Sequence, residues 1–199
     1  MVGGSGEYRC LESLKMSFFG IGNMTADLTL SASKIEEIVD DLSREIANRH
    51  RSTPNLFVAG IAEGGLGLSL RLAAKMEEEF SREIPTGSLN VSFHRDDIGT
   101  NPIPRDCTPT QLPPEVESST CILVDDVFFS GRTVRAALNE LFDQGRPACV
   151  ELAVLVDRGH RCLPLKPDYV GIELNTEVGQ VVEAIVGEVS SEQDRVIVS

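Results

Sequence analysis

The stretch ILVDDVFFSGRTV, residues 122–134, is the most informative part of the sequence. It begins with an apolar run that is typical of a buried strand and passes into two adjacent carboxylates, Asp125 and Asp126. After a short loop, the sequence Ser-Gly-Arg-Thr is typical of the start of a helix. A strand, a short loop and a helix in this order are the repeating unit of α/β proteins.

The loop of this stretch has the chemistry of a phosphate site. The N–H groups at a helix start are unpaired and lie at the positive end of the helix dipole, which suits a phosphate dianion. Gly131 lets the backbone close around the anion, and the hydroxyls of Ser130 and Thr133 add donors. Asp125 and Asp126 suit sugar hydroxyls, or waters on a divalent ion. The stretch therefore predicts a site for a phosphorylated ribose; the alternative is an ordinary capped turn.

The flanking sequence predicts further strands and helices in alternation. Apolar residues at helical spacing predict a helix from Ser33, with Ser33 and Glu36 as a capping box, and a second helix with Leu68, Leu72, Met76 and Phe80 facing inward. The glycines Gly64, Gly65 and Gly67 predict a turn before that second helix. The remaining predicted elements are strands at 56–61, 89–93, 121–124 and 150–156, a helix at 133–142, and weaker strands at 169–172 and 181–189. This order predicts an α/β fold, a mainly parallel twisted sheet with helices on both faces.

Glycine or charged residues follow four of the predicted strands. In parallel sheets, ligands bind at the carboxyl ends of the strands, so these segments predict one shared site. Residues 98–119 carry five prolines and no periodicity, which favours a lid or a binding loop. The four segments are Ala62-Glu63-Gly64-Gly65, Asp96-Asp97, Asp125-Asp126 and Asp157-Arg158.

Length and composition limit the other possibilities. The chain has 199 residues, of which 41% are hydrophobic, which predicts one domain at 31–199 and an extension at 1–30. A net charge of -13 disfavours non-specific nucleic-acid binding, so an RNA site needs a local basic patch. The five cysteines and three histidines have no metal-ligand spacing, and no apolar run is long enough to span a membrane. Without a secretory segment, we expect a cytoplasmic protein.

The stretch at 122–134 resembles the phosphoribosyl pyrophosphate (PRPP) motif of type I phosphoribosyltransferases. Four more stretches, at 93–98, 131–137, 143–148 and 152–161, resemble the family of bifunctional pyrimidine operon attenuation proteins and uracil phosphoribosyltransferases, over about residues 33–190. The resemblance implies the type I fold with a small hood, and a dimer or tetramer. It also implies transfer from PRPP to uracil with Mg²⁺, giving UMP and pyrophosphate, and binding of a leader mRNA.

The resemblance also implies roles for particular residues. Asp125 and Asp126 are placed at the ribose hydroxyls, and Arg95 on the pyrophosphate side. Asp96 and Asp97 are placed near the magnesium shell, the loop at about 98–114 over the site, and Asp157 and Arg158 beside the uracil pocket. The residues implied in PRPP or UMP binding are Asp125, Asp126, Val127, Ser130, Gly131, Arg132, Thr133 and Val134.

The sequence departs from the family at the pyrophosphate loop. The usual Gly-Ile-basic-Thr-Arg-Gly is replaced here by GIAEGG, residues 60–65, whose variable part is Ala62, Glu63, Gly64 and Gly65. Both basic residues of the pattern are missing, and a carboxylate is present instead. The glycines still allow a backbone cradle, but a carboxylate at Glu63 would repel pyrophosphate. Phe129 stands where purine enzymes usually have an acid, which favours a pyrimidine base, or it serves only packing.

The RNA-binding residues are partly kept. Arg44, Arg161 and Lys166 are basic where the family's RNA face needs charge, whereas Asp40 is acidic and Ile172 is apolar. The three basic residues are equally compatible with a solvated rim. Three functions stay open: a uracil phosphoribosyltransferase, an RNA-binding regulator that senses UMP or PRPP with weak or lost catalysis, and a diverged relative with another partner.

Overall fold

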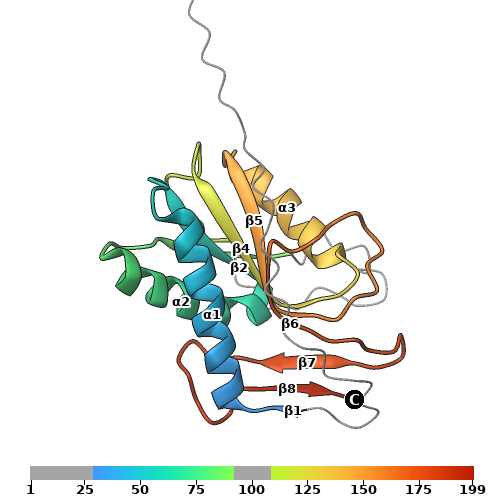
Figure 1. Cartoon of the computed structure of the whole chain (residues 1–199). Helices are drawn as coiled ribbons and strands as arrows, with labels where there is room; N and C mark the ends of the chain where they lie inside the picture. Colours follow the sequence, from blue (N-terminus) through green and yellow to red (C-terminus); the bar gives the residue numbers. More distant parts are fainter. Residues whose placement is uncertain (1–28, 92–108) are drawn as a thin grey trace, which may run out of the picture.

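A computed structural model describes residues 29–91 and 109–199 of the chain (Figure 1). Its centre is a five-stranded parallel sheet in the order β3-β2-β4-β5-β6. The strands are β2 (Leu56–Ile61), β3 (Thr86–Leu89), β4 (Thr120–Phe128), β5 (Cys149–Asp157) and β6 (Tyr169–Glu173). The helices are α1 (Ala32–His50), α2 (Ala62–Phe80) and α3 (Arg132–Gln144). The predicted α/β fold is therefore confirmed.

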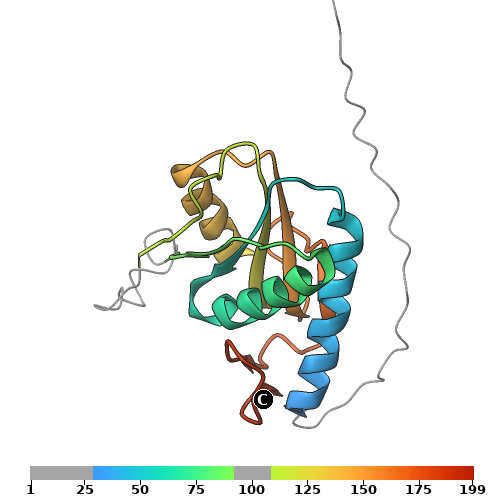
Figure 2. The same ribbon diagram turned by 90° about the vertical axis from the view of Figure 1, so that its left-hand side faces the viewer.

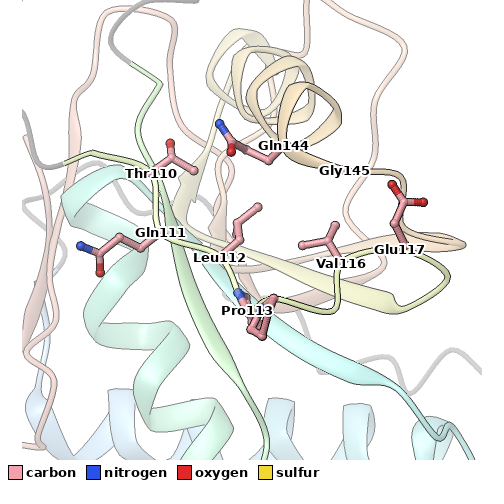
Figure 3. A pocket seen from close by; sticks show the side chains of 9 residues that line it. Thr110, Gln111, Leu112, Pro113, Val116, Glu117, Gln144 and Gly145 are labelled. Atoms are coloured by element: carbon pink, nitrogen blue, oxygen red, sulfur yellow. The ribbon is translucent and has the colours of Figure 1, made fainter.

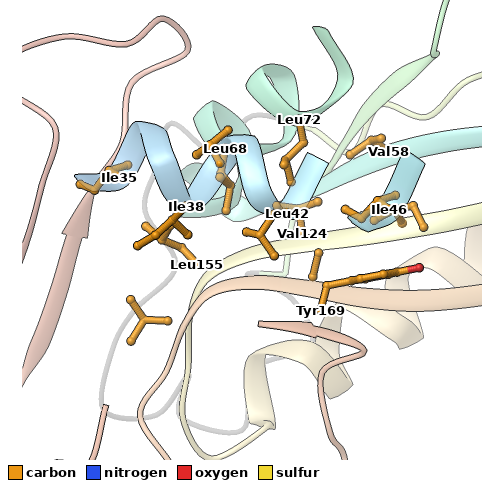
Figure 4. Close-up of a cluster of buried hydrophobic side chains, with 14 of the residues drawn as sticks. Ile35, Ile38, Leu42, Ile46, Val58, Leu68, Leu72, Val124, Leu155 and Tyr169 are labelled. Carbon is orange, nitrogen blue, oxygen red and sulfur yellow. The ribbon is translucent and has the colours of Figure 1, made fainter. Parts of the chain in front are cut away.

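Two apolar cores sandwich the sheet. Successive residues of a strand point to opposite faces, so Ile122 and Val124 pack against α1 and α2, whereas Cys121 and Leu123 pack against α3. Every residue of β2 is buried, as expected for a central strand covered on both faces. Figure 4 shows the first core, and Figure 2 places α3 on the opposite side of the sheet from α1. The helices thus fix the central strands, whose carboxyl ends carry the predicted site.

A small antiparallel sheet forms the hood predicted by the family resemblance. Its order is β1-β8-β7, with β1 (Thr29–Leu30), β7 (Val182–Ile185) and β8 (Arg195–Val198), and it lies beyond the N-terminal end of α1 (Figure 1). Arg71 on α2 ties it down, because Nη1 donates to the buried carboxylate of Asp194 at 2.5 Å and Nη2 pairs with Glu36 on α1. The hood is therefore attached to both helices of that face.

The start of α1 differs from the prediction. The N-cap is Ser31, and no side chain caps this helix among the described residues, so the capping box of Ser33 and Glu36 is wrong. The spacing is right for such a box, but the Glu36 carboxylate instead pairs with Arg71 and Lys75. Two cations on the neighbouring helix are stronger partners than one backbone N–H.

Three other boundaries also differ. The glycines expected to form a turn lie inside α2, which starts directly after β2 at Ala62. The strand expected at 89–93 is β3, which ends at Leu89, and residues 92–93 lie outside the described residues. The strand expected at 121–124 continues to Phe128, so Asp125 and Asp126 belong to β4 itself, paired along β5.

In the described ranges, we find no helix with the length and apolar character of a membrane span.

Candidate functional site

The turn between β4 and α3, residues 128–131, is shaped for an anion. Gly131 is the N-cap of α3 and has a φ of 85°, a left-handed conformation that glycine adopts at little cost. Because it is glycine, this N-cap has no side chain that could bond the first N–H groups of α3. The Ser130 Oγ accepts a hydrogen bond from the Arg132 N–H at 3.3 Å, and both Arg132 and Thr133 are exposed. The helix start thus offers backbone and hydroxyl donors to a phosphate.

The backbone of this turn is held from behind by the segment after β5. The Ser130 carbonyl accepts hydrogen bonds from the N–H groups of Cys162 and Leu163, at 3.0 and 3.3 Å. The Phe128 carbonyl accepts one from the Arg158 N–H at 3.1 Å. These bonds use the carbonyls of the turn and do not occupy its N–H groups. The turn is preorganised before any ligand arrives.

The acidic pair lies one step before the turn, at the carboxyl end of β4. The Asp125 Oδ1 accepts from the Asp126 N–H at 3.1 Å, and the Asp126 Oδ1 accepts from the Val127 N–H at 2.6 Å. Asp125 is buried and Asp126 half-buried, and no Lys or Arg of the described segments pairs with either. Burial, and then the charge of Asp126, raises the pKa of Asp125 well above its usual range. Burial also raises the pKa of Asp126. Such a pair is suited to polar hydroxyls or a cation.

Asp125→Asn should make the ligand-free protein more stable at neutral pH. The folded pKa of Asp125 is raised, so above about pH 4 the unfolded chain loses its proton first and the wild type loses stability as pH rises. Asparagine removes this slope and can still accept from the Asp126 N–H. The melting temperature of the variant should therefore exceed that of the wild type by a difference that grows from pH 4 to pH 8. A variant that is less stable than wild type at every pH would contradict this explanation.

The start of α2 brings the predicted pyrophosphate loop, residues 62–65, next to the acidic pair. Ala62 has a φ of 49°, which turns the chain sharply from β2 into the helix. A Cβ built on Gly64 would lie 2.5 Å from the Asp126 Oδ2, and one built on Gly65 would lie 2.2 Å from the Val124 carbonyl oxygen. Gly65 is therefore needed for close packing against the backbone of β4, whereas Gly64 leaves room for the Asp126 carboxylate. Ala62, Glu63, Gly64 and Gly65 form a first helical turn next to the acidic pair, which is again a helix N-terminus that suits an anion.

The end of β5 is the third segment. The buried carboxylate of Asp157 accepts from the Gly159 N–H at 3.0 Å and pairs with the Arg161 guanidinium. Arg158 is also buried; its guanidinium donates to the hood connection at residues 176–180 and lies over the Phe129 ring. The sequence did not single out this connection as part of the site. Its polar run between two strands, NTEVGQ, is the signal that could have found it.

Not all the predicted site residues are brought together. Segments 62–65, 125–134 and 157–158 meet at one edge of the sheet, because β2, β4 and β5 are parallel neighbours. Arg95, Asp96 and Asp97, and the loop up to residue 108, lie outside the described residues. Arg44 is on α1 and pairs with Asp41 at 2.8 Å, whereas Arg161 and Lys166 belong to a loop that packs on the α3 side through Leu165. The three predicted RNA residues therefore occupy different faces.

A hollow of about 480 Å³ lies away from this site (Figure 3). It is formed between the C-terminal end of α3, at Gln144 and Gly145, and the segment at 110–117. The length of α3 separates it from Gly131, which is about 20 Å at the usual rise per residue. Its one charged lining residue, Glu117, accepts from the Arg146 N–H at 3.1 Å. The residues that line the hollow include no Lys or Arg and no start of a helix, which distinguishes it from the turn at 128–131.

The comparisons with known proteins agree with this arrangement. Residues 30–188 match the phosphoribosyl transferase domain family. A hypoxanthine phosphoribosyltransferase of Staphylococcus aureus has the same fold, with a TM-score of 0.57 and 17% identity over 79% of this chain and 81% of that one. The fold and the strand-end site thus define the phosphoribosyltransferase class.

Relatives of higher sequence identity define the family more narrowly. The bifunctional protein PyrR of Deinococcus deserti is 45% identical over 157 residues, which cover 77% of this chain and 84% of that protein. The bifunctional protein PyrR of Streptomyces coelicolor is 42% identical over 160 residues, covering 80% and 82%. The chain belongs to the phosphoribosyltransferase family and, within it, to the bifunctional PyrR proteins.

Proposed function

We propose that the chain transfers ribose 5-phosphate from PRPP to uracil, giving UMP and pyrophosphate. The observation that carries the proposal is the start of α3, with a glycine N-cap at Gly131, one short turn after the carboxylates of Asp125 and Asp126. A phosphate dianion fits the turn, and the two carboxylates are acceptors for the hydroxyls of the attached ribose. In the reaction the bond from the anomeric carbon to pyrophosphate breaks, a bond to the uracil nitrogen forms, and that nitrogen loses its proton.

The protein contributes mainly position and charge to this reaction. The turn at 128–131 is fixed by backbone hydrogen bonds to 158–163, so that it holds the 5'-phosphate without rearranging. The first turn of α2 lies beside Asp126, where its N–H groups are close to the pyrophosphate side. Arg95, Asp96 and Asp97 keep their proposed roles on the pyrophosphate side and near magnesium, and the loop at about 98–114 keeps its role as a lid.

Magnesium fits the oxygen-rich edge of the site. No three metal-ligating side chains converge within the described ranges, so the protein does not provide a complete cage there. Mg²⁺ usually keeps several waters and binds through one or two carboxylates and the phosphates of a substrate, which agrees with the acidic edge at Asp125 and Asp126. When bound, magnesium offsets the charge of pyrophosphate.

Two measurements test the proposed function. Purified protein mixed with uracil, PRPP and Mg²⁺ should form UMP, and calorimetry should detect binding of UMP and PRPP. The absence of heat with either ligand, with and without magnesium, would remove the proposal of a PRPP site. Binding without turnover would instead favour the regulator described next.

A nucleotide-sensing regulator that binds leader mRNA is the second candidate function. The name of the relatives, bifunctional protein PyrR, supports it. Against it, Arg161 pairs with Asp157 and Arg44 pairs with Asp41, so that a carboxylate offsets the charge of two of the three basic residues. Retention of RNA by the protein at moderate salt tests this function. A dimer or tetramer stays a prediction, which size-exclusion chromatography with light scattering can check.

Glu63→Arg should increase the rate of UMP formation, and by more than Glu63→Ala does. A carboxylate in the first turn of α2 repels a pyrophosphate bound there, alanine removes the repulsion, and arginine adds attraction. We expect the rate of UMP formation to be roughly tenfold higher for Glu63→Arg than for wild type, which corresponds to about 1.4 kcal/mol of transition-state stabilisation. The check is the steady-state rate of the three proteins with uracil and PRPP. Equal rates would show that residue 63 does not face pyrophosphate.

A further inference from the structure

The guanidinium of Arg158 joins two parts of the chain that border the site. Nε donates to the Thr176 Oγ1 at 3.3 Å, and Nη2 donates to the carbonyls of Gln180 and Glu177 at 2.7 and 3.4 Å. These acceptors all belong to the connection between β6 and the hood. The Thr176 hydroxyl in turn donates to the Arg158 carbonyl at 3.3 Å. Arg158 thus fixes the 176–180 connection against the end of β5.

The other side of Arg158 contacts the turn at residues 128–131, which we call the phosphate turn. Its guanidinium carbon lies 4.3 Å from the centre of the Phe129 ring, and Phe129 directly precedes Ser130. The edge of the His160 ring contacts the same Phe129 ring, with 6.2 Å between ring centres, while its Nε2 bonds the Thr176 carbonyl at 2.6 Å. An arginine stacked on an aromatic face, with its N–H groups bonded, is held in one orientation.

We propose that Arg158 is a positioning residue for the base. It sets the spacing between the phosphate turn and the 176–180 connection. This inference rests on the proposed function: Arg158 directly follows β5, the parallel neighbour of β4, so it borders the site where a ribonucleotide held at residues 128–134 would carry its base. Arg158 is only 6% exposed and its donors are directed to the hood connection. It therefore acts on the base through the surfaces that it holds, and does not contact it.

Two ligands separate this role from phosphate binding. Ribose 5-phosphate occupies the phosphate turn and the acidic pair, and UMP adds the base. In Arg158→Ala, the Kd of UMP should rise about tenfold or more, because several charge-assisted bonds that fix the base pocket are lost. The Kd of ribose 5-phosphate should stay within about threefold, since the turn keeps its backbone bonds to Cys162 and Leu163. Calorimetry gives both constants.

Three further variants make the result specific. Arg82 is a matched control, because its guanidinium donates to the carbonyls of Thr53 and Pro54 and lies over the Phe80 ring, far from the site. Arg82→Ala should lower the melting temperature without changing the ratio of the two Kd values. Arg158→Lys should restore UMP binding only in part, because lysine keeps the charge but not the planar fork. Phe129→Leu should reproduce the selective loss, even if Arg158→Ala does not fold.

The outcomes are distinguishable. Equal weakening of both ligands, no weakening of either, or full recovery in Arg158→Lys would overturn the positioning role. A ratio that changes equally in Arg82→Ala would show that only general stability matters. If wild-type protein bound neither ligand, the proposed function itself would be wrong, and the role of Arg158 would be wrong with it.

Discussion

Gly65→Ala should destabilise the protein by about 3 kcal/mol, at the upper end of the usual cost of overpacking. An added Cβ would lie 2.2 Å from the Val124 carbonyl oxygen and 3.1 Å from its carbon, both in the backbone of the central strand β4. Neither atom can move without shifting α2 away from the sheet. For a chain of this size, a loss of about 3 kcal/mol lowers the melting temperature by roughly 6–12 °C. Thermal denaturation followed by circular dichroism measures it.

Gly64→Ala is the matched control one residue earlier. Its Cβ would meet the carboxylate of Asp126 at 2.5 Å, which is the end of a side chain and not part of the backbone. Alanine is also favoured over glycine within a helix by about 1 kcal/mol, so stability should be kept or slightly raised. The displaced carboxylate should instead weaken UMP binding. Equal losses of stability in the two variants would show that the packing around α2 is more adaptable than described.

Asp126→Asn should weaken UMP and PRPP binding by about 10- to 100-fold, because hydrogen bonds to a charged acceptor contribute about 1.5–3 kcal/mol. The half-buried Asp126 is more accessible than Asp125 and lies against Gly64, between the phosphate turn and the start of α2. Its folded pKa is raised by burial, so a neutral side chain of the same shape should leave stability equal or higher. Calorimetry and a melting curve of the same sample check both parts.

The melting curve decides between two roles for Asp126. A fall of many degrees would mark the residue as structural, through its bond to the Val127 N–H. Unchanged binding with unchanged stability would remove the acidic pair from the ligand site. The selective loss of affinity is the result expected for a side chain whose ionised form is useful only when a ligand is present.

The central sheet could be predicted because buried parallel strands carry continuous apolar runs. Both β2 and β5 were found for this reason, and α1 and α2 were found from apolar residues at helical spacing. The glycines at 64–67 were misplaced because glycine serves turns and close packing alike, and the sequence does not show the carbonyl that a Cβ would strike. The pair at Asp125 and Asp126 was read as following the strand because charge usually marks a strand end.

The hood was expected only from the family resemblance. Its strand β1 has two residues and β8 has four, which is too short for a pattern, and their pairing joins residues 29–30 with 196–197. The sequence could place segments 62–65, 125–134 and 157–158 at one edge of the sheet, since each lies at the carboxyl end of a predicted strand. The partners of Arg158 were not, because its contacts with residues 176–180 depend on how the hood connection returns over the sheet.

The strand order of the hood bears on the sequence of events during synthesis. The strand β8 lies between β1 and β7, yet it follows every other described element along the chain. The parallel sheet can therefore condense while translation continues, but β1 has no neighbour until the ribosome has made β8. Asp194, just before β8, is the carboxylate that meets Arg71. Until then Arg71 has only Glu36, so we expect a nascent chain to form the carboxyl edge of the parallel sheet before the hood is assembled.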